Sequence, residues 1–273
     1  MTHDEFHFNI YKTEFFGQYW KAKETKAVIV LVHGMGEHST RYVHVAKKLT
    51  INHYSVVAFD HFGHGKTEGK RGHNPSFEAV LESVSKTIEK ATTIFENKPI
   101  FLYGHSLGGN VVFNYLLRKK HNIKGGIATG AFLKLAFEPP KLKLFAGKIL
   151  QKIAPTTTMP SGLDATGISR IDTEVNKYKD DPLIHDKISP NFGLTFIETG
   201  KWALENASNL KTPMLLLHGT DDKIIDYKAI EEFSNKTKKA TLKLYQGGYH
   251  ELHNDLCAEE VFQDIIDWLN TQL

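Results

Sequence analysis

The sequence of 273 residues has a single cysteine, Cys257, so an intrachain disulfide is excluded and a reducing compartment suits the chain. It has no apolar run near the roughly 18 residues that a membrane-spanning helix needs. Its first residues lack the positive and apolar regions of a secretory signal. These absences predict a cytoplasmic protein, and they leave room for peripheral contact with a membrane surface.

The sequence also has no surplus of charge of either sign. Its 34 Lys and Arg residues nearly balance its 31 Asp and Glu residues. A protein that binds nucleic acid through the phosphate backbone usually carries a strongly basic surface. We therefore expect no nucleic-acid partner, while a hydrophobic fraction of 41% fits an ordinary globular domain.

Signatures of bound cofactors are missing as well. Gly34 and Gly36 begin a G-x-G pattern, but Ser39 stands where the dinucleotide-binding fingerprint has its third glycine. His61 and His64 lie close together, but no HExxH motif or cysteine pair accompanies them. We interpret both histidines as residues that pack or hydrogen-bond in a turn, and we expect no metal and no cofactor.

Apolar runs that end in polar, glycine-rich turns indicate the strands of the fold. They cover residues 27–32, 54–59, 100–103, 126–129, 213–217 and 242–245, and helix-compatible segments lie near 39–50, 75–96, 107–120, 226–238 and 258–272. This alternation predicts an α/β fold with a mostly parallel central sheet flanked by helices on both faces. Aromatic-rich pieces within residues 6–30 predict an antiparallel hairpin at its start.

The alternation of strands and helices breaks between about residues 133 and 195, and an insertion of this length predicts a lid. Within it, residues 141–153 have helical periodicity. One stripe holds Leu142, Phe145, Ile149 and Ile153, and Lys141, Lys148 and Lys152 lie largely off it. A basic amphipathic helix of this kind either lies on a membrane surface or packs its apolar stripe over a pocket.

The pentapeptide Gly104-His105-Ser106-Leu107-Gly108 is the main chemical signal. It follows the apolar run 99–103 and opens the helix-compatible segment 109–117, which is the setting of a nucleophile elbow. The glycines let strand and helix approach each other, and the helix N-terminus favours developing negative charge. The motif predicts Ser106 as a nucleophile, and the plainer interpretation is an ordinary strand–helix turn.

A serine nucleophile needs a base, and the base needs an orienting carboxylate. In the chain order Ser, Asp, His, the candidate acid follows the run 213–217 and the candidate base follows the run 242–245. Asp221 competes with Asp222 for the first role, and His253 competes with His250 for the second. We favour Asp222 and His250, since His250 directly follows a Gly-Gly-Tyr turn.

The oxyanion of the transition state needs two backbone N–H donors. The fold takes one from the residue after the serine, which is Leu107. The other comes from the loop after an early strand, where Met35 follows His33-Gly34. Only the backbone of Met35 is needed, so its side chain is free to shape the pocket.

Four blocks of the sequence resemble the monoacylglycerol lipase and lysophospholipase family of serine α/β-hydrolases. They are residues 33–42, 60–72, 104–109, and 217–222 with Tyr249-His250. The resemblance covers about residues 12–270. It implies the α/β-hydrolase fold, with a core of residues 1–132 and 201–273 and a helical lid insertion of residues 133–200. The implied functional residues are the triad Ser106, Asp222 and His250, the oxyanion donors Met35 and Leu107, and the glycerol contacts Glu37, Arg41, His105, Tyr178 and His253.

The resemblance further implies hydrolysis of monoacylglycerols to fatty acid and glycerol through an acyl-enzyme, with a small lipid ester as the substrate. Such a substrate has two hydroxyls to hydrogen-bond and one acyl chain to bury. A lysophospholipase, another carboxylesterase or a thioesterase would use the same machinery. A dehalogenase would need Asp where Ser106 stands. A non-catalytic binding protein on the same scaffold is the alternative from another class, and the complete catalytic set argues against it.

Overall fold

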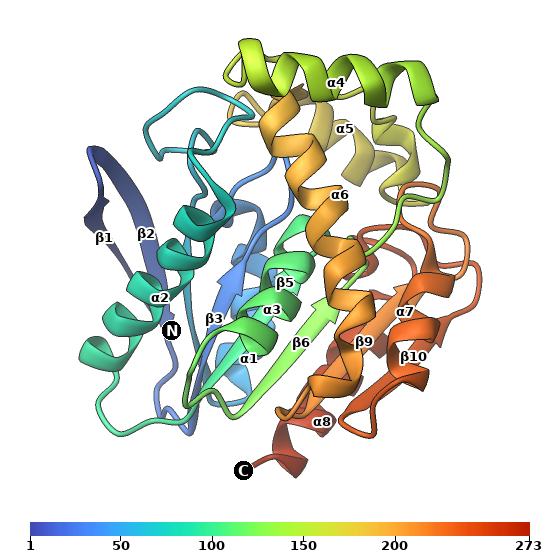
Figure 1. Ribbon diagram of the computed structural model, residues 1–273. Helices are drawn as coiled ribbons and strands as arrows, with labels where there is room; N and C mark the ends of the chain where they lie inside the picture. The colour runs from blue at the N-terminus through green and yellow to red at the C-terminus, as the bar shows by residue number, and fades with distance from the viewer.

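The computed structural model describes the backbone of residues 1–273 and all side chains except those of Lys141 and Lys143. An eight-stranded sheet forms its centre, with the strand order β1-β2-β4-β3-β5-β6-β9-β10 (Figure 1). The strands are β1 (Thr2–Ile10), β2 (Thr13–Lys21), β3 (Ala27–Val32), β4 (Tyr54–Phe59), β5 (Ile100–His105), β6 (Gly125–Thr129), β9 (Met214–Gly219) and β10 (Ala240–Tyr245). β1 and β2 form an antiparallel hairpin, β2 also pairs antiparallel with β4, and the other neighbours are parallel.

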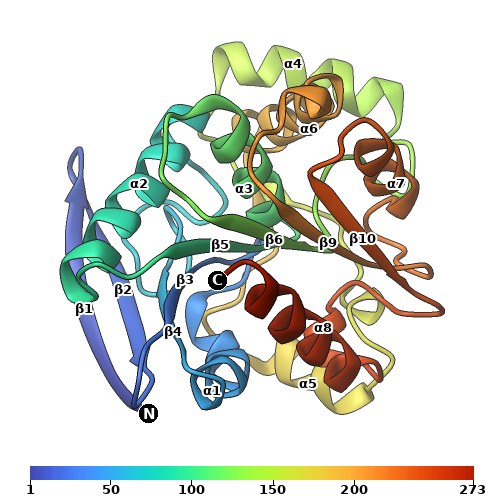
Figure 2. The same cartoon turned by 90° about the horizontal axis from the view of Figure 1, so that it is seen from below.

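Helices cover both faces of this sheet, as Figure 2 shows. One face packs against α2 (Phe77–Ile94), α3 (Leu107–Arg118), α6 (Pro190–Glu205) and α7 (Tyr227–Asn235). The other packs against α1 (Val43–Ile51) and α8 (Ala258–Thr271). The inner strands β3, β4 and β5 are buried along their whole length, which is why they read as unbroken apolar runs. The prediction of a mostly parallel sheet between two helical layers is confirmed.

The predicted elements differ from the observed ones mainly at their ends. β5 continues to His105, two residues beyond the predicted strand, because its last residues still pair with β6. β10 begins at Ala240 instead of residue 242, and alternate side chains along it are exposed because it is an edge strand. The hairpin expected within residues 6–30 is present as β1 and β2, and it starts earlier, at Thr2.

The segment between β6 and β9 contains α4 (Lys141–Ile153), α5 (Asp172–Asp180), the whole of α6, and two short paired strands, β7 (Met159–Pro160) and β8 (Lys187–Ile188). α4 lies across the end of α6, above the carboxyl ends of the strands (Figure 1). α6 itself packs on α3 and contributes Phe192 and Phe196 to the main core. The predicted lid boundary at residue 200 therefore falls inside a continuous helix that serves both the lid and the core.

The apolar stripe of α4 faces solvent. Its four members, listed with their exposed fractions, are Leu142 (78%), Phe145 (63%), Ile149 (45%) and Ile153 (73%). The opposite side of the helix faces α6, where the backbone of Gly147 approaches Leu194. The interpretation in which this stripe packs over a pocket is therefore wrong. No helix among the described residues is long and apolar enough to cross a membrane.

The part of the insertion that contains α5 is bonded to the core on two sides. The His185 N–H donates to the Gly36 carbonyl over 2.9 Å, and His38 pairs with Asp181 at 2.9 Å. On the other side, Arg170 pairs with the carboxylate of Asp255 at 2.9 Å. These bonds hold residues 161–189 over the carboxyl edge of the sheet.

Candidate active site

Ser106 lies at a sharp turn between β5 and α3. Its φ of 52° and ψ of −116° put a non-glycine residue in a strained conformation, which tight packing around it maintains. A Cβ on Gly108 would lie 2.0 Å from the carbonyl oxygen of Val32, so only glycine lets α3 approach β3 this closely. The turn therefore presents the serine hydroxyl at the carboxyl edge of the sheet, as a nucleophile elbow requires.

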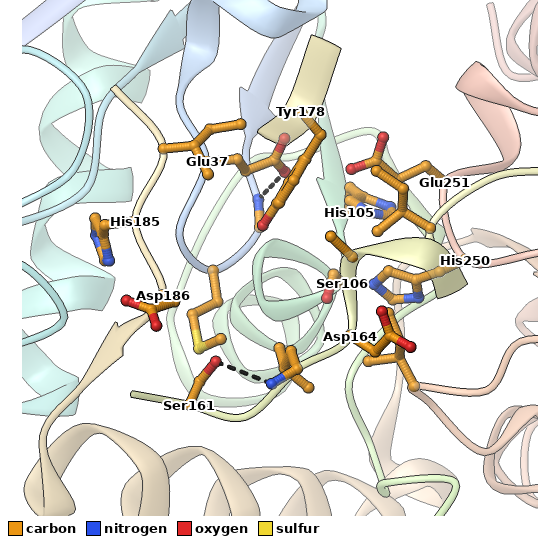
Figure 3. A pocket seen from close by; sticks show the side chains of 17 residues that line it. Glu37, His105, Ser106, Ser161, Asp164, Tyr178, His185, Asp186, His250 and Glu251 are labelled. Carbon is orange, nitrogen blue, oxygen red and sulfur yellow. Dashed lines mark hydrogen bonds between the residues drawn. The ribbon is translucent and has the colours of Figure 1, made fainter. Parts of the chain in front are cut away.

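His250 and Asp222 meet at the same edge, from the loops after β10 and β9. Nδ1 of His250 lies 2.7 Å from Oδ2 of Asp222. Oδ1 of that carboxylate accepts the backbone N–H groups of Ile224 and Ile225 at 2.9 and 3.0 Å. Figure 3 shows the imidazole of His250 beside Ser106. With one nitrogen bound to the carboxylate, the other nitrogen of the ring can receive a proton from the serine.

A second histidine, His218, also touches the acid: its Nε2 lies 3.0 Å from Oδ2 of Asp222, and both side chains are fully buried. Burial raises the pKa of the Asp222 carboxyl, but the charge of His250 and these hydrogen bonds outweigh it, and the net pKa is lowered. Burial lowers the pKa of His250, but the Asp222 charge outweighs that effect and leaves the pKa raised. The pair thus keeps the carboxylate ionised and makes the imidazole more basic.

The predicted oxyanion donors lie beside the serine. Leu107 is the first residue of α3, so its N–H has no carbonyl within the helix to bond. Met35 lies in the loop after β3 and lines the same cavity as Ser106. The preceding residue, Gly34, comes so close that a Cβ on it would lie 3.3 Å from the Cβ of Ser106. This close approach puts the loop within reach of a carbonyl bound at the serine.

Two cavities meet at Ser106. The first, which we call the polar cavity, measures about 150 Å³, and the polar side chains of Glu37, His105, Tyr178 and Glu251 lie around it with the serine (Figure 3). The second, of about 270 Å³, lies between the serine and the lid and is largely apolar. Its walls include Phe132, Leu135, Phe137, Phe192, Phe196 and Ile225. The arrangement suits a substrate with a polar group on one side of the bond to be cleaved and a hydrocarbon chain on the other.

Three of the five predicted glycerol contacts, Glu37, His105 and Tyr178, line the polar cavity, and Arg41 and His253 stand behind its wall. Arg41 lies over the Tyr178 ring, 4.8 Å from its centroid. His253 stacks on Tyr42 with 5.0 Å between ring centroids. The two residues can thus support the cavity wall without lining it.

A buried ion cluster joins these residues. Arg41 donates through Nη1 to Glu37 at 2.6 Å, and through Nη1 and Nη2 to both carboxylate oxygens of Glu251 at 2.7 and 2.8 Å. The other oxygen of Glu37 accepts the Tyr42 hydroxyl and the Gly34 N–H, each at 2.6 Å. Arg41 therefore ties the loop that carries Met35 to the loop that carries His250.

Sequence reasoning assigned no role to Glu251 or His218. Glu251 directly follows the base, and His218 precedes the acid by four residues. This closeness in sequence to the triad is the one feature that could have pointed to a role for them. Their partners were not evident, since Arg41 lies 210 positions from Glu251. The lid residues that line the polar cavity, such as Asp164 and Asp186, were also not predicted from the sequence.

Comparison with known proteins finds a matching family, similar sequences and a similar solved structure. The family model described as serine aminopeptidase, S33, matches residues 23–257. The human monoglyceride lipase is 32% identical over 263 residues, covering 93% of this chain and 86% of that protein. An abhydrolase domain-containing protein of Dictyostelium discoideum is 37% identical over 251 residues, but the chain spans only 26% of its length. The crystal structure of a Paleococcus ferrophilus monoacylglycerol lipase superposes with a TM-score of 0.88 at 33% identity, covering 95% of this chain and 99% of that one.

Proposed function

Because the chain belongs to the monoacylglycerol lipase and lysophospholipase family of serine α/β-hydrolases, we propose that this ester hydrolase cleaves monoacylglycerols to fatty acid and glycerol. The observation that carries the proposal is the pair of cavities that meet at Ser106, one with several polar side chains around it and the other largely apolar. A glycerol group with free hydroxyls fits the first, and an acyl chain fits the second. The names of the human and Paleococcus ferrophilus relatives support the same substrate class.

In the proposed mechanism the Ser106 hydroxyl attacks the ester carbonyl while His250 takes its proton. Asp222 holds the imidazole in the required tautomer and stabilises its positive charge. The N–H groups of Met35 and Leu107 bind the oxyanion, and losing one such donor costs roughly 10²–10³ in rate. His250 then gives its proton to the departing glycerol oxygen. Water, deprotonated by His250, attacks the acyl-enzyme, and His250 returns that proton to the Ser106 oxygen as the fatty acid leaves.

We also propose that α4 rests on a lipid surface. Its exposed apolar stripe is flanked by Lys148 and Lys152, and positive charge beside exposed apolar side chains suits an interface rich in anionic lipid. Phe137 and Pro140, just before α4, line the apolar cavity. A lipid-bound α4 would thus bring the mouth of the acyl cavity to the membrane, where monoacylglycerols reside.

The experiment that tests the substrate is a matched comparison. A long-chain monoacylglycerol and the lysophospholipid with the same acyl chain are hydrolysed by the wild type, with Ser106→Ala as the blank. We expect a preference for the monoacylglycerol and no activity above background in the blank. A preference for the lysophospholipid would replace the proposed substrate with the family's other one. Equal activity in the wild type and the blank would refute Ser106 as the nucleophile.

A further inference from the structure

The polar cavity is acidic. Its lining holds four carboxylates, from Glu37, Glu251, Asp164 and Asp186, and Figure 3 shows them around Ser106. Among the lining residues, all of which the structure describes, there is no lysine or arginine. Two of its three histidines are uncharged at neutral pH, since burial lowers the pKa of His105 to about 3 and that of His185 to about 4. The third, His250, is bonded to the Asp222 carboxylate, which balances its charge.

The nearby guanidinium of Arg41 is already neutralised. It lies behind the wall, and Glu37 and Glu251 together take three of its hydrogen bonds. Burial raises the pKa of Glu37. Its carboxylate nevertheless accepts hydrogen bonds from Gly34, Tyr42 and the charged Arg41, and this set of donors favours the ionised form at neutral pH. Two carboxylates against one guanidinium leave the buried cluster with one negative charge in excess, and both carboxylates are only 2% exposed.

The two lid carboxylates add to this at the rim. Asp164 accepts the N–H of Thr166, and Asp186 pairs with Lys187 at 3.0 Å. Both are more exposed than the buried cluster, so solvent and salt screen them and their effect is smaller. The discriminating charge is therefore in the cluster, and Glu251 supplies the carboxylate in excess.

We infer that Glu251 is a specificity-determining residue: by cancelling Arg41 it closes the leaving-group cavity to anionic head groups and leaves it open to neutral and cationic ones. This inference rests on the proposed function, because it describes the leaving group of that same site. Phosphate monoesters carry a charge of about −1.5 to −2 at pH 7. Such a group would enter a cavity that offers excess negative charge and no unpaired guanidinium.

The test uses three esters with one acyl chain: 1-octanoylglycerol, 1-octanoylglycerol 3-phosphate and octanoylcholine. Because the three esters share one acyl group, binding in the acyl cavity cancels when their kcat/KM values are compared as ratios. We expect the phosphate ester to be cleaved on the order of a hundred-fold less efficiently than the glycerol ester, the size expected for about two charges roughly 10 Å from one carboxylate at an effective dielectric constant of about 20. We expect the choline ester to be accepted. Cleavage of the phosphate ester within about three-fold of the glycerol ester would overturn the inference.

Glu251→Gln removes the charge and keeps the shape. It should raise the phosphate-to-glycerol ratio on the order of a hundred-fold, by the same Coulomb reasoning. Any change in the triad cancels in this ratio, because both esters react at the same serine. The matched control is Asp180→Asn, an exposed carboxylate on the lid helix α5 and outside the cavity lining, which should leave the ratio unchanged. An unchanged ratio in Glu251→Gln, or an equal change in both variants, would refute the role of Glu251.

A separate readout keeps the inference testable if monoacylglycerols are not the substrate. Free glycerol, choline and glycerol 3-phosphate are used to slow the labelling of Ser106 by a fluorophosphonate probe. We expect glycerol and choline to protect at lower concentrations than glycerol 3-phosphate, whichever ester proves to be hydrolysed. The proposed function fails if the glycerol ester is not cleaved. The inference fails if the anion protects best.

Discussion

Exchange of Asp222 for Asn should disable the enzyme although the side chain keeps its shape. Asp222 now receives four donors: Oδ1 takes two backbone N–H groups, and Oδ2 takes His250 and His218. An asparagine has one acceptor oxygen and one NH₂ donor. If the oxygen faces the backbone N–H groups, the NH₂ faces His250 and forces its proton to the other nitrogen. If the amide is flipped, the NH₂ points at two N–H groups.

The magnitude follows from this conflict. In the first orientation the nitrogen of His250 that should receive the serine proton is already protonated, and such a wrong tautomer costs about 10⁴ in kcat. In the second, buried donors are left without acceptors at a cost of about 1–3 kcal/mol each in folding stability. We expect Asp222→Asn to adopt the first orientation, to remain folded, and to lose at least a thousand-fold in kcat/KM.

The assay is hydrolysis of a chromogenic octanoate ester, with the rate of fluorophosphonate labelling as a measure of the nucleophile alone. Asp221→Asn is the matched control, because the Asp221 carboxylate lies next to Asp222 in the chain but is exposed and makes no hydrogen bond to His250. Thermal denaturation of both variants separates loss of chemistry from loss of fold. The reasoning is refuted if Asp222→Asn keeps activity within ten-fold of the wild type, or if Asp221→Asn proves the more damaging change.

Three further outcomes are expected. Neutral His250 must accept the serine proton, and its pKa is raised above 6.5. As the pH is lowered, kcat/KM should therefore begin to fall while the pH is still above 6.5, and Glu251→Gln should move this fall to lower pH. A fall that begins only below pH 6 in the wild type would contradict the assignment of His250. Gly108→Ala should lower Tm by on the order of 10 °C, from about 3 kcal/mol or more of overlap with backbone, while Gly147→Ala, whose Cβ meets nothing nearer than 3.6 Å, should not lower it. Sedimentation with anionic vesicles should decrease for Phe145→Ser and for a variant in which four lysines, Lys141, Lys143, Lys148 and Lys152, are changed to Glu. The lipid-surface proposal fails if vesicle binding is unchanged in both variants.

The features that the sequence predicted are those encoded by neighbouring residues. Buried strands such as β3 and β4 are apolar throughout because both faces of the sheet are covered, so their positions follow from local composition alone. The elbow is likewise local, since Ser106 and Gly108 lie within one turn. The order of acid and base along the chain then follows from the connectivity of the sheet.

The features that sequence reasoning missed depend on pairs far apart in the chain. The Arg41–Glu251 contact joins positions 210 residues apart, and no periodicity relates them. For α4 the amphipathic pattern was correct, but a pattern fixes only which side chains share a face. Whether that face meets the core or solvent depends on what occupies the other side, and here α6 already packs there.

The insertion over the site thus serves two different ends of the substrate. Its α5 side is fastened to the oxyanion loop through Gly36 and to the loop of the base through Asp255, so the wall of the polar cavity moves only if these bonds break. A fixed wall can discriminate charge, because its carboxylates are held in place before the substrate arrives. On the other side, α4 packs on α6 and presents apolar side chains outward, and in our proposal this is the face that meets the lipid surface. Selection of the leaving group and capture of the acyl chain are therefore separable, and a variant that alters one should leave the other intact.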